Sequence, residues 1–319
     1  MPELRLLEAE KVREKLTAQQ QRQIRKLYEQ SAEHVRDWSS SLEGRENISS
    51  VLRREYLTQL ERDLNEEISK IGSSIEKSIK LSMMATAQAV VKDVNSILRS
   101  WGLDFRTAYS FVPGDIVQAV ATGRIYGGNW SLSKTIWGHN KKIHQDIHTI
   151  IAQGIAENKS SYEIAKDLEK YVSPSAAKPW NWNKVYPNTN KIVDYNAQRL
   201  ARTMVGHAYQ QSFVQTTQSN PFFEGYHWLT ANNHRVCPLC KGYAEDIHAD
   251  GLPAGVFPKD NLPIDHPNGQ CTLSVYMTKT TDEIVDSLKR WAHGEENEGL
   301  DDFAESLGFP VRVVKSSIQ

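Results

Sequence analysis

The three cysteines of this 319-residue chain all fall in one segment, and a histidine lies close to the third of them. Cys237 and Cys240 form a Cys-x2-Cys pair, and His266 and Cys271 form a second pair with an Asn-Gly turn between them. A Cys-x2-Cys turn allows two thiolates to bind one metal ion, and a distant pair completes a tetrahedron. Three soft thiolates with one imidazole favour Zn²⁺. We therefore predict a single zinc site formed by these four residues.

The predicted zinc has a structural role. Four protein ligands leave no coordination position open for water. The segment is rich in Gly, Pro and Asp and poor in apolar residues, so a metal ion would add stability that its core lacks. His234 and His248 are alternative fourth ligands, and Asp265 is a candidate hydrogen-bond acceptor beside His266. The competing interpretation is that the cysteines cluster by chance as small buried residues.

Three other patterns point to chemistry less strongly. His144 and His148 lie one helical turn apart, but Gln145 stands where a zinc protease has its glutamate, so an exposed helix face is favoured. Residues 232–235 offer a histidine and an arginine beside the cysteines, as in some nucleases, without an obvious carboxylate partner. The glycines of residues 123–128 lack the spacing and the Lys-Ser/Thr of a P-loop, so they predict a turn.

Long helices are expected in the N-terminal third of the chain. Residues 4–38 carry spaced apolar side chains among charged and Gln residues, which predicts an exposed helix or a mobile arm. A second helix should continue to Trp101 and Gly102, because glycine commonly follows a helix end. Its apolar residues recur at a mean step of about 3.67, which keeps them on one face of a nearly straight helix. This apolar stripe consists of Leu57, Leu60, Leu64, Ile68, Ile71, Ile75 and Ile79.

The apolar stripe has two compatible interpretations. It can form the core of a helical hairpin, or it can be an assembly surface that packs on another subunit. A helix of about 50 residues would be about 75 Å long, which exceeds the size of a small domain. The sequence leaves both interpretations open.

The remaining pattern predicts a mainly α fold with a small α+β module towards the C-terminus. Further helices are expected over residues 111–122, 131–140, 143–157, 160–171, 192–219, 282–293 and 300–307. Ser160 and Glu163 form a capping signature at the start of one of these helices. Alternating residues predict strands over 223–230 and 272–277, and an edge strand or docking tail at 311–314.

The predicted organisation has five parts. They are a helical arm for assembly (1–104), a helical middle domain (105–172), a loop (173–191), a helix with a zinc-bound β-module (192–280), and acidic helices with a C-terminal tail (281–319). Arg202 and Thr203 in the helix before the β-module are expected either to contact that module or to lie on a solvated face.

Composition restricts the classes of function. The net charge of −1 argues against a DNA binder held by a general positive field. Residues 282–305 contain nine acidic and two basic residues, so the rest of the chain carries about six positive charges. No apolar run approaches the ~20 residues that span a bilayer, and the N-terminus lacks a signal-peptide core. We therefore expect a cytosolic chain without a membrane partner.

Three stretches of the sequence resemble the phage minor head, or head morphogenesis, proteins of the Mu F-like family. They are residues 123–171, residues 197–213 (AQRLARTMVGHAYQQSF) and residues 227–271, which close on His-Pro-Asn and a cysteine. The likeness covers roughly residues 110–280. Relatives often end the module with H-P-N-C-R-C, whereas Gly269 and Gln270 stand here in place of the first Cys and the Arg. The acidic residue that commonly precedes the first cysteine is also absent.

This resemblance implies a structural, non-enzymatic virion protein. Such a protein is present in few copies in the capsid interior, after a period in the host cytoplasm during assembly. Its implied partners are the portal protein and the major capsid or scaffolding protein. Copies of itself are a further candidate partner, and packaged DNA is a weaker one.

Two alternatives remain open from the sequence. One is a zinc-containing nuclease or a transferase-like phage effector that uses His234, His248 or His266. The other is a DNA-binding protein that uses the zinc module and the mildly basic middle of the chain. The basic residues in question are Arg124, Lys134, Lys141 and Lys142.

Overall fold

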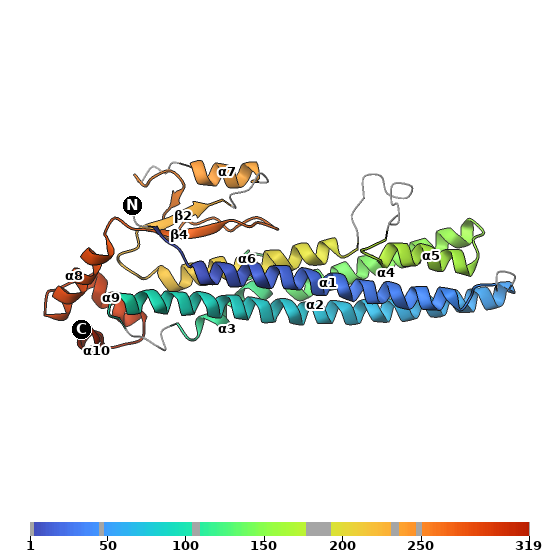
Figure 1. Ribbon diagram of the computed structural model, residues 1–319, viewed down its shortest axis with the longest axis horizontal. Helices are drawn as coiled ribbons and strands as arrows, with labels where there is room; N and C mark the ends of the chain where they lie inside the picture. The colour runs from blue at the N-terminus through green and yellow to red at the C-terminus, as the bar shows by residue number, and fades with distance from the viewer. Residues whose placement is uncertain are drawn as a thin grey trace. The chain divides into compact units, whose positions relative to one another are not determined.

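Helices make up most of the fold and a small antiparallel sheet lies in its C-terminal part, as predicted (Figure 1). This computed structural model describes residues 3–44, 48–103, 109–176, 193–230, 236–246 and 251–318. Among the described residues, no helix is both long enough and apolar enough to cross a membrane.

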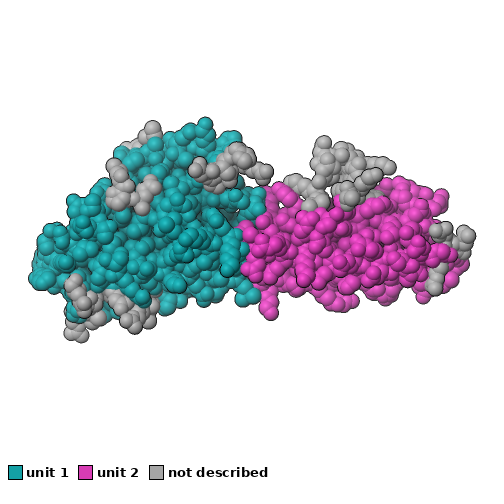
Figure 2. Space-filling view, viewed as in Figure 1, with its two compact units in different colours: residues 1–16, 81–120, 202–319 teal, residues 17–80, 121–201 magenta. Residues whose placement is uncertain are grey.

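The chain divides into two compact units (Figure 2). Unit 1 comprises residues 1–16, 81–120 and 202–319, and unit 2 comprises residues 17–80 and 121–201. The helices α1 (Leu7–Ser40), α2 (Ser50–Ser100) and α6 (Tyr195–Thr217) each contribute a large part to both units. The grouping therefore cuts across the five segments expected from the sequence, because contacts within each unit join parts of the chain that are far apart in sequence.

The apolar stripe of α2 forms the core of unit 2. None of its seven residues is more than 4% exposed, and they are Leu57, Leu60, Leu64, Ile68, Ile71, Ile75 and Ile79. In unit 2 the helices α1 and α2 run side by side (Figure 1), and His34 on α1 bonds to Glu67 on α2 at 2.8 Å. The stripe is thus covered by the chain itself. This corrects its interpretation as an assembly surface, because periodicity indicates which face is buried but not what covers it.

Unit 2 also contains α4 (Leu132–Ala156) and α5 (Ser161–Val172). The sequence predicted two helices where α4 is a single helix, because Asn140 and the two lysines after it do not break a helix as Pro would. The capping box predicted at the start of α5 is confirmed: the Ser160 hydroxyl accepts the Glu163 N–H, and the Glu163 carboxylate accepts the Ser160 N–H.

A four-stranded antiparallel sheet of order β1-β4-β2-β3 lies in unit 1. The expected strands are confirmed as β2 (Gly225–Leu229) and β4 (Thr272–Tyr276). The two edge strands were not predicted, since β1 (Glu3–Leu4) and β3 (Val256–Phe257) have only two residues each. The sheet packs on α6, where the rings of Phe213 and Tyr226 lie 5.9 Å apart in an edge-to-face arrangement.

Four shorter helices complete the described part of unit 1 apart from α7, which carries the first cysteine pair. They include α3 (Val112–Thr122), α8 (Thr281–Ala292) and α9 (Glu298–Ser306). The fourth, α10 (Val311–Ser317), corrects the expected edge strand, and it contacts α8 and α9 as a docked tail would. Pro310 is its N-cap residue, in extended conformation, and the helix forms although three of the four residues 311–314 are valines.

Candidate metal centre

Cys237 and Cys240 lie in the first turn of α7 (Pro238–Glu245), a helix that the sequence did not predict. Cys237 is the N-cap residue, and Pro238 at the first helical position has a φ angle suited to the turn. The backbone N–H of Cys240 donates to the Cys237 Sγ at 3.4 Å. This bond lowers the pKa of the Cys237 thiol, while burial raises the pKa of the Cys240 thiol. The turn thus presents two sulfur atoms to one point.

His266 supplies an imidazole to the same point. Its Nε2 lies 3.2 Å from the Cys237 Sγ, and its Nδ1 lies 3.0 Å from the Pro267 carbonyl oxygen. When Nδ1–H donates to that carbonyl, Nε2 carries the lone pair that a metal ion needs. Burial opposes protonation, but the Pro267 bond and the charge of Asp265 outweigh it and raise the pKa of His266.

Cys271 lies near the same cluster, because its sulfur atom is close to that of Cys240. The ligand atoms of Cys237, Cys240 and His266 all lie within 4.8 Å of one another, and so do those of Cys240, Asp265 and Cys271. Zn–S and Zn–N bonds of about 2.3 and 2.0 Å at a tetrahedral angle place sulfur and nitrogen about 3.5 Å apart. The spacing of these atoms is close to that geometry, so the cluster can bind a metal ion.

Asp265 accepts hydrogen bonds from the backbone of two candidate ligands. Its carboxylate accepts the backbone N–H of His266 at 2.8 Å and also the backbone N–H of Cys271. Burial raises the pKa of Asp265. Because its carboxylate lies within 4.8 Å of the sulfur atoms of Cys240 and Cys271, Asp265 can either hold the ligand residues in place or bind the metal ion itself. The other two candidates, His234 and His248, lie outside the described residues.

Gly269 approaches Asp265 so closely that a side chain would not fit. A Cβ built on Gly269 would overlap the carboxylate of Asp265. In this chain the residue makes room for Asp265, so the loop closes on Cys271 alone.

The helix α6 holds the loop between the second pair of candidate ligands. Arg202 Nη1 donates to the Asn268 Oδ1 at 2.9 Å, and the Asn268 N–H donates to the Thr203 Oγ1 at 2.8 Å. This confirms the expected contact of Arg202 and Thr203 with the module. Asn268 has a φ of 72°, a left-handed conformation that asparagine tolerates better than most residues.

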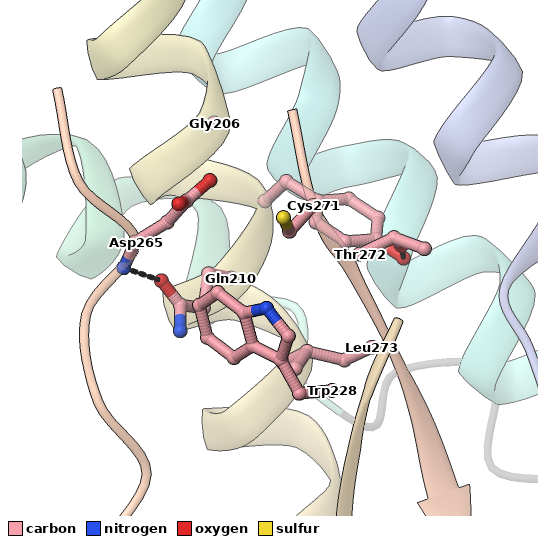
Figure 3. A pocket seen from close by; sticks show the side chains of 8 residues that line it. Gly206, Gln210, Trp228, Asp265, Cys271, Thr272 and Leu273 are labelled. Atoms are coloured by element: carbon pink, nitrogen blue, oxygen red, sulfur yellow. Dashed lines mark hydrogen bonds between the residues drawn. The ribbon is translucent and has the colours of Figure 1, made fainter. Parts of the chain in front are cut away.

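About one to two turns further along, His207 and Gln210 of α6 bind the residues just before His266. Gln210 Nε2 donates to the Pro263 carbonyl at 2.6 Å, and the Asp265 N–H donates to the Gln210 Oε1 at 3.0 Å (Figure 3). His207 Nε2 lies 2.8 Å from the Asp265 carbonyl oxygen. The sequence did not single out His207 or Gln210, because neither has a spacing that relates it to a residue more than 50 positions away.

The cavity beside the cluster is small. Figure 3 shows Gln210 from α6, Trp228 from β2, and Cys271 with Thr272 from the start of β4 around it. Its volume of about 10 Å³ holds one water molecule.

Two other sequence patterns have structural explanations. His148 Nδ1 lies 3.0 Å from the Glu61 Oε1, and His144 Nε2 lies 3.2 Å from the Asn65 carbonyl, so both imidazoles bind to α2. The glycines after α3 form a turn, as predicted, and Gly123 has a φ of 81°. Neither pattern belongs to the candidate metal centre.

No family model, no curated protein and no solved structure matches the chain.

Proposed function

We propose that this chain is a zinc-stabilised, non-enzymatic minor capsid protein of a tailed bacteriophage. The observation that carries the proposal is a pair of ligand clusters that share Cys240: one includes Cys237 and His266, and the other includes Asp265 and Cys271. Four protein ligands of this kind favour a closed structural zinc site. The order of the three stretches that resemble Mu F-like proteins supports the virion role.

The proposed zinc ion would join α7 to a loop and strand that lie further along the chain in unit 1. It links the first turn of α7 to the loop that carries His266, and both to Cys271 at the start of β4. Metal-binding free energy then becomes folding free energy of the module.

In the proposed role the chain is present in few copies in the capsid interior and associates with the portal protein. It also meets the major capsid or scaffolding protein in the host cytoplasm during assembly. The zinc-stabilised module supplies a rigid surface for these contacts. This role requires that the chain enters heads and that loss of zinc reduces its entry.

The test is the protein content of purified heads from phage that carry a tagged copy of this chain. We expect mass spectrometry to find the chain in heads at low copy number, and we expect the tag to capture the portal protein. Cys240→Ser should lose zinc and reduce incorporation, because it removes the most buried ligand. Leu239→Ser is the matched control, since Leu239 lies in the same turn and is exposed. Absence of the wild-type chain from heads and from portal complexes would refute the proposal.

A further inference from the structure

We infer that the N-terminal segment, residues 3–16, is a positioning element of the metal centre, so that its docking and metal binding are coupled. The inference rests on the zinc site proposed above and concerns residues more than 220 positions away from it in sequence. Every residue that carries it belongs to unit 1.

Arg13 holds the backbone of the ligand Cys271. Its Nη1 donates to the Cys271 carbonyl oxygen at 2.8 Å, and its guanidinium lies 4.6 Å from the centre of the Tyr209 ring. Only 8% of Arg13 is exposed, although it is an arginine on the first helix. A buried guanidinium fixed by a ring on one side and a carbonyl on the other restricts the position of that carbonyl.

Glu10 holds the next residue through a continuous hydrogen-bond network. The Thr272 hydroxyl donates to the Glu10 Oε1 at 3.1 Å, and the carboxylate of Glu10 is paired with Arg5. Since a hydroxyl has one proton, Thr272 must accept from the Tyr209 hydroxyl, which lies 3.1 Å away. The network therefore fixes Thr272 in one orientation, directly after the last candidate ligand.

Strand pairing extends the same attachment along β4. Glu3 pairs with Tyr276 and Leu4 pairs with Val275, so β1 covers the edge of the strand that begins next to Cys271. The segment is anchored on its other side as well, because the Ala9 N–H donates to the Asp93 Oδ2 of α2 at 2.9 Å. Residues 3–16 thus connect β4 to the helical part of unit 1.

These contacts predict that docking of residues 3–16 and metal binding depend on each other. The loop from His266 to Cys271 must be ordered for both ligands to meet the first cysteine pair, and Arg13 and Glu10 fix the end of that loop. If the docked N-terminal segment strengthens metal binding by some factor, the metal ion strengthens docking by the same factor. Residues that support metal ligands commonly change affinity by about 10- to 100-fold when they are replaced.

The first test measures zinc affinity by competition with a chromophoric chelator. We expect Arg13→Met to bind zinc at least about tenfold more weakly than the wild type. Lys11→Met is the matched control, because Lys11 lies two residues away on α1 and is 70% exposed, so its affinity should equal that of the wild type. Circular dichroism of both variants establishes that α1 and α2 are folded.

The second test needs no substitution and therefore applies even if Arg13→Met does not fold. Hydrogen exchange of the wild type is compared with zinc bound and after removal of zinc by a chelator. We expect faster exchange in residues 3–16 without zinc, and unchanged exchange in α5 of unit 2 as the internal control. The local control is the loop 265–271, which should also exchange faster.

The outcomes separate this inference from the proposed function. A wild-type chain that binds no zinc overturns the zinc site and the coupling together. A wild-type chain that binds zinc, with unchanged exchange in residues 3–16 and equal affinity in a folded Arg13→Met, overturns the coupling alone. Weaker binding in Arg13→Met with faster exchange in residues 3–16 supports it.

Discussion

The loop that carries His266 is held mainly from outside, by side chains of α6. Asn268 shows this most clearly, because it combines a left-handed backbone with two bonds to α6, from Arg202 and to Thr203. The left-handed conformation turns the chain back so that Cys271 follows at ligand distance from Cys240. The backbone of one residue and two polar side chains thus decide where the second ligand pair lies.

Two substitutions of Asn268 distinguish the contribution of its backbone conformation to stability from that of its side-chain hydrogen bond. Asn268→Ala loses the bond from Arg202 and places an unfavourable residue at a φ of 72°. We expect the free energy of unfolding to fall by about 1–2 kcal/mol for alanine, and by less for Asn268→Gly, because glycine adopts this conformation freely. Chemical denaturation at saturating zinc measures both. Equal losses for alanine and glycine would mean that the side-chain bond, and not the backbone, decides stability here.

The sequence alone located the candidate metal ligands, because cysteine is rare in this chain. Three cysteines in 319 residues, together with His266, identified a candidate ligand set from spacing alone. The supporting residues could not be found in the same way. Gln210 and Arg13 are ordinary polar residues on helices, and only the folded chain brings them to the loop that they hold.

Whether an element could be predicted from the sequence depended on how local its signal is. The N-cap of α5 was predictable, because the Ser160 to Glu163 pattern is local. By contrast, α7 has eight residues that include Pro238 and Gly242, a composition typical of turns. The strands β1 and β3 are too short to show an alternating pattern, and their partners decide their structure.

The contact between α4 and α5 depends on a glycine. A Cβ built on Gly154 would lie 2.5 Å from the Ile164 Cγ1, so Gly154→Ala requires the two helices to separate. We expect it to lower the free energy of unfolding of unit 2 by about 1–3 kcal/mol, as overpacked cores do. Thermal unfolding followed by circular dichroism measures the change.

Gly138→Ala is the matched control on the same helix. A Cβ at Gly138 meets no atom within 4 Å, so the substitution should be neutral or should stabilise α4 by up to about 1 kcal/mol. If Gly154→Ala is as stable as Gly138→Ala, α4 and α5 are not in close contact at this point.

The apolar stripe that the sequence located on α2 forms the core of unit 2. Its period predicted the buried face correctly, and the fold class followed from it and from the two confirmed strands, β2 and β4. Its partners were not predictable, because the pattern of one amphipathic helix is the same for a neighbour in the chain and for another subunit.

Truncation at the centre of the stripe tests its role as core. Ile68 is fully buried, so we expect Ile68→Ala to lower the free energy of unfolding by about 2–5 kcal/mol. Leu81→Ala is the control on the same helix, because Leu81 is 62% exposed and should change stability by at most about 0.5 kcal/mol. Denaturant unfolding of the isolated chain measures both, and a silent Ile68→Ala would restore the assembly-surface interpretation.

The proposed function depends most on a closed zinc site formed by Cys237, Cys240, His266 and Cys271 in unit 1. X-ray absorption at the zinc edge, on protein purified without added metal and quantified for zinc, tests it most directly. We expect one zinc ion per chain, with three sulfur ligands at about 2.3 Å and one nitrogen ligand at about 2.0–2.1 Å. Protein without zinc, or zinc surrounded only by oxygen and nitrogen, would contradict it.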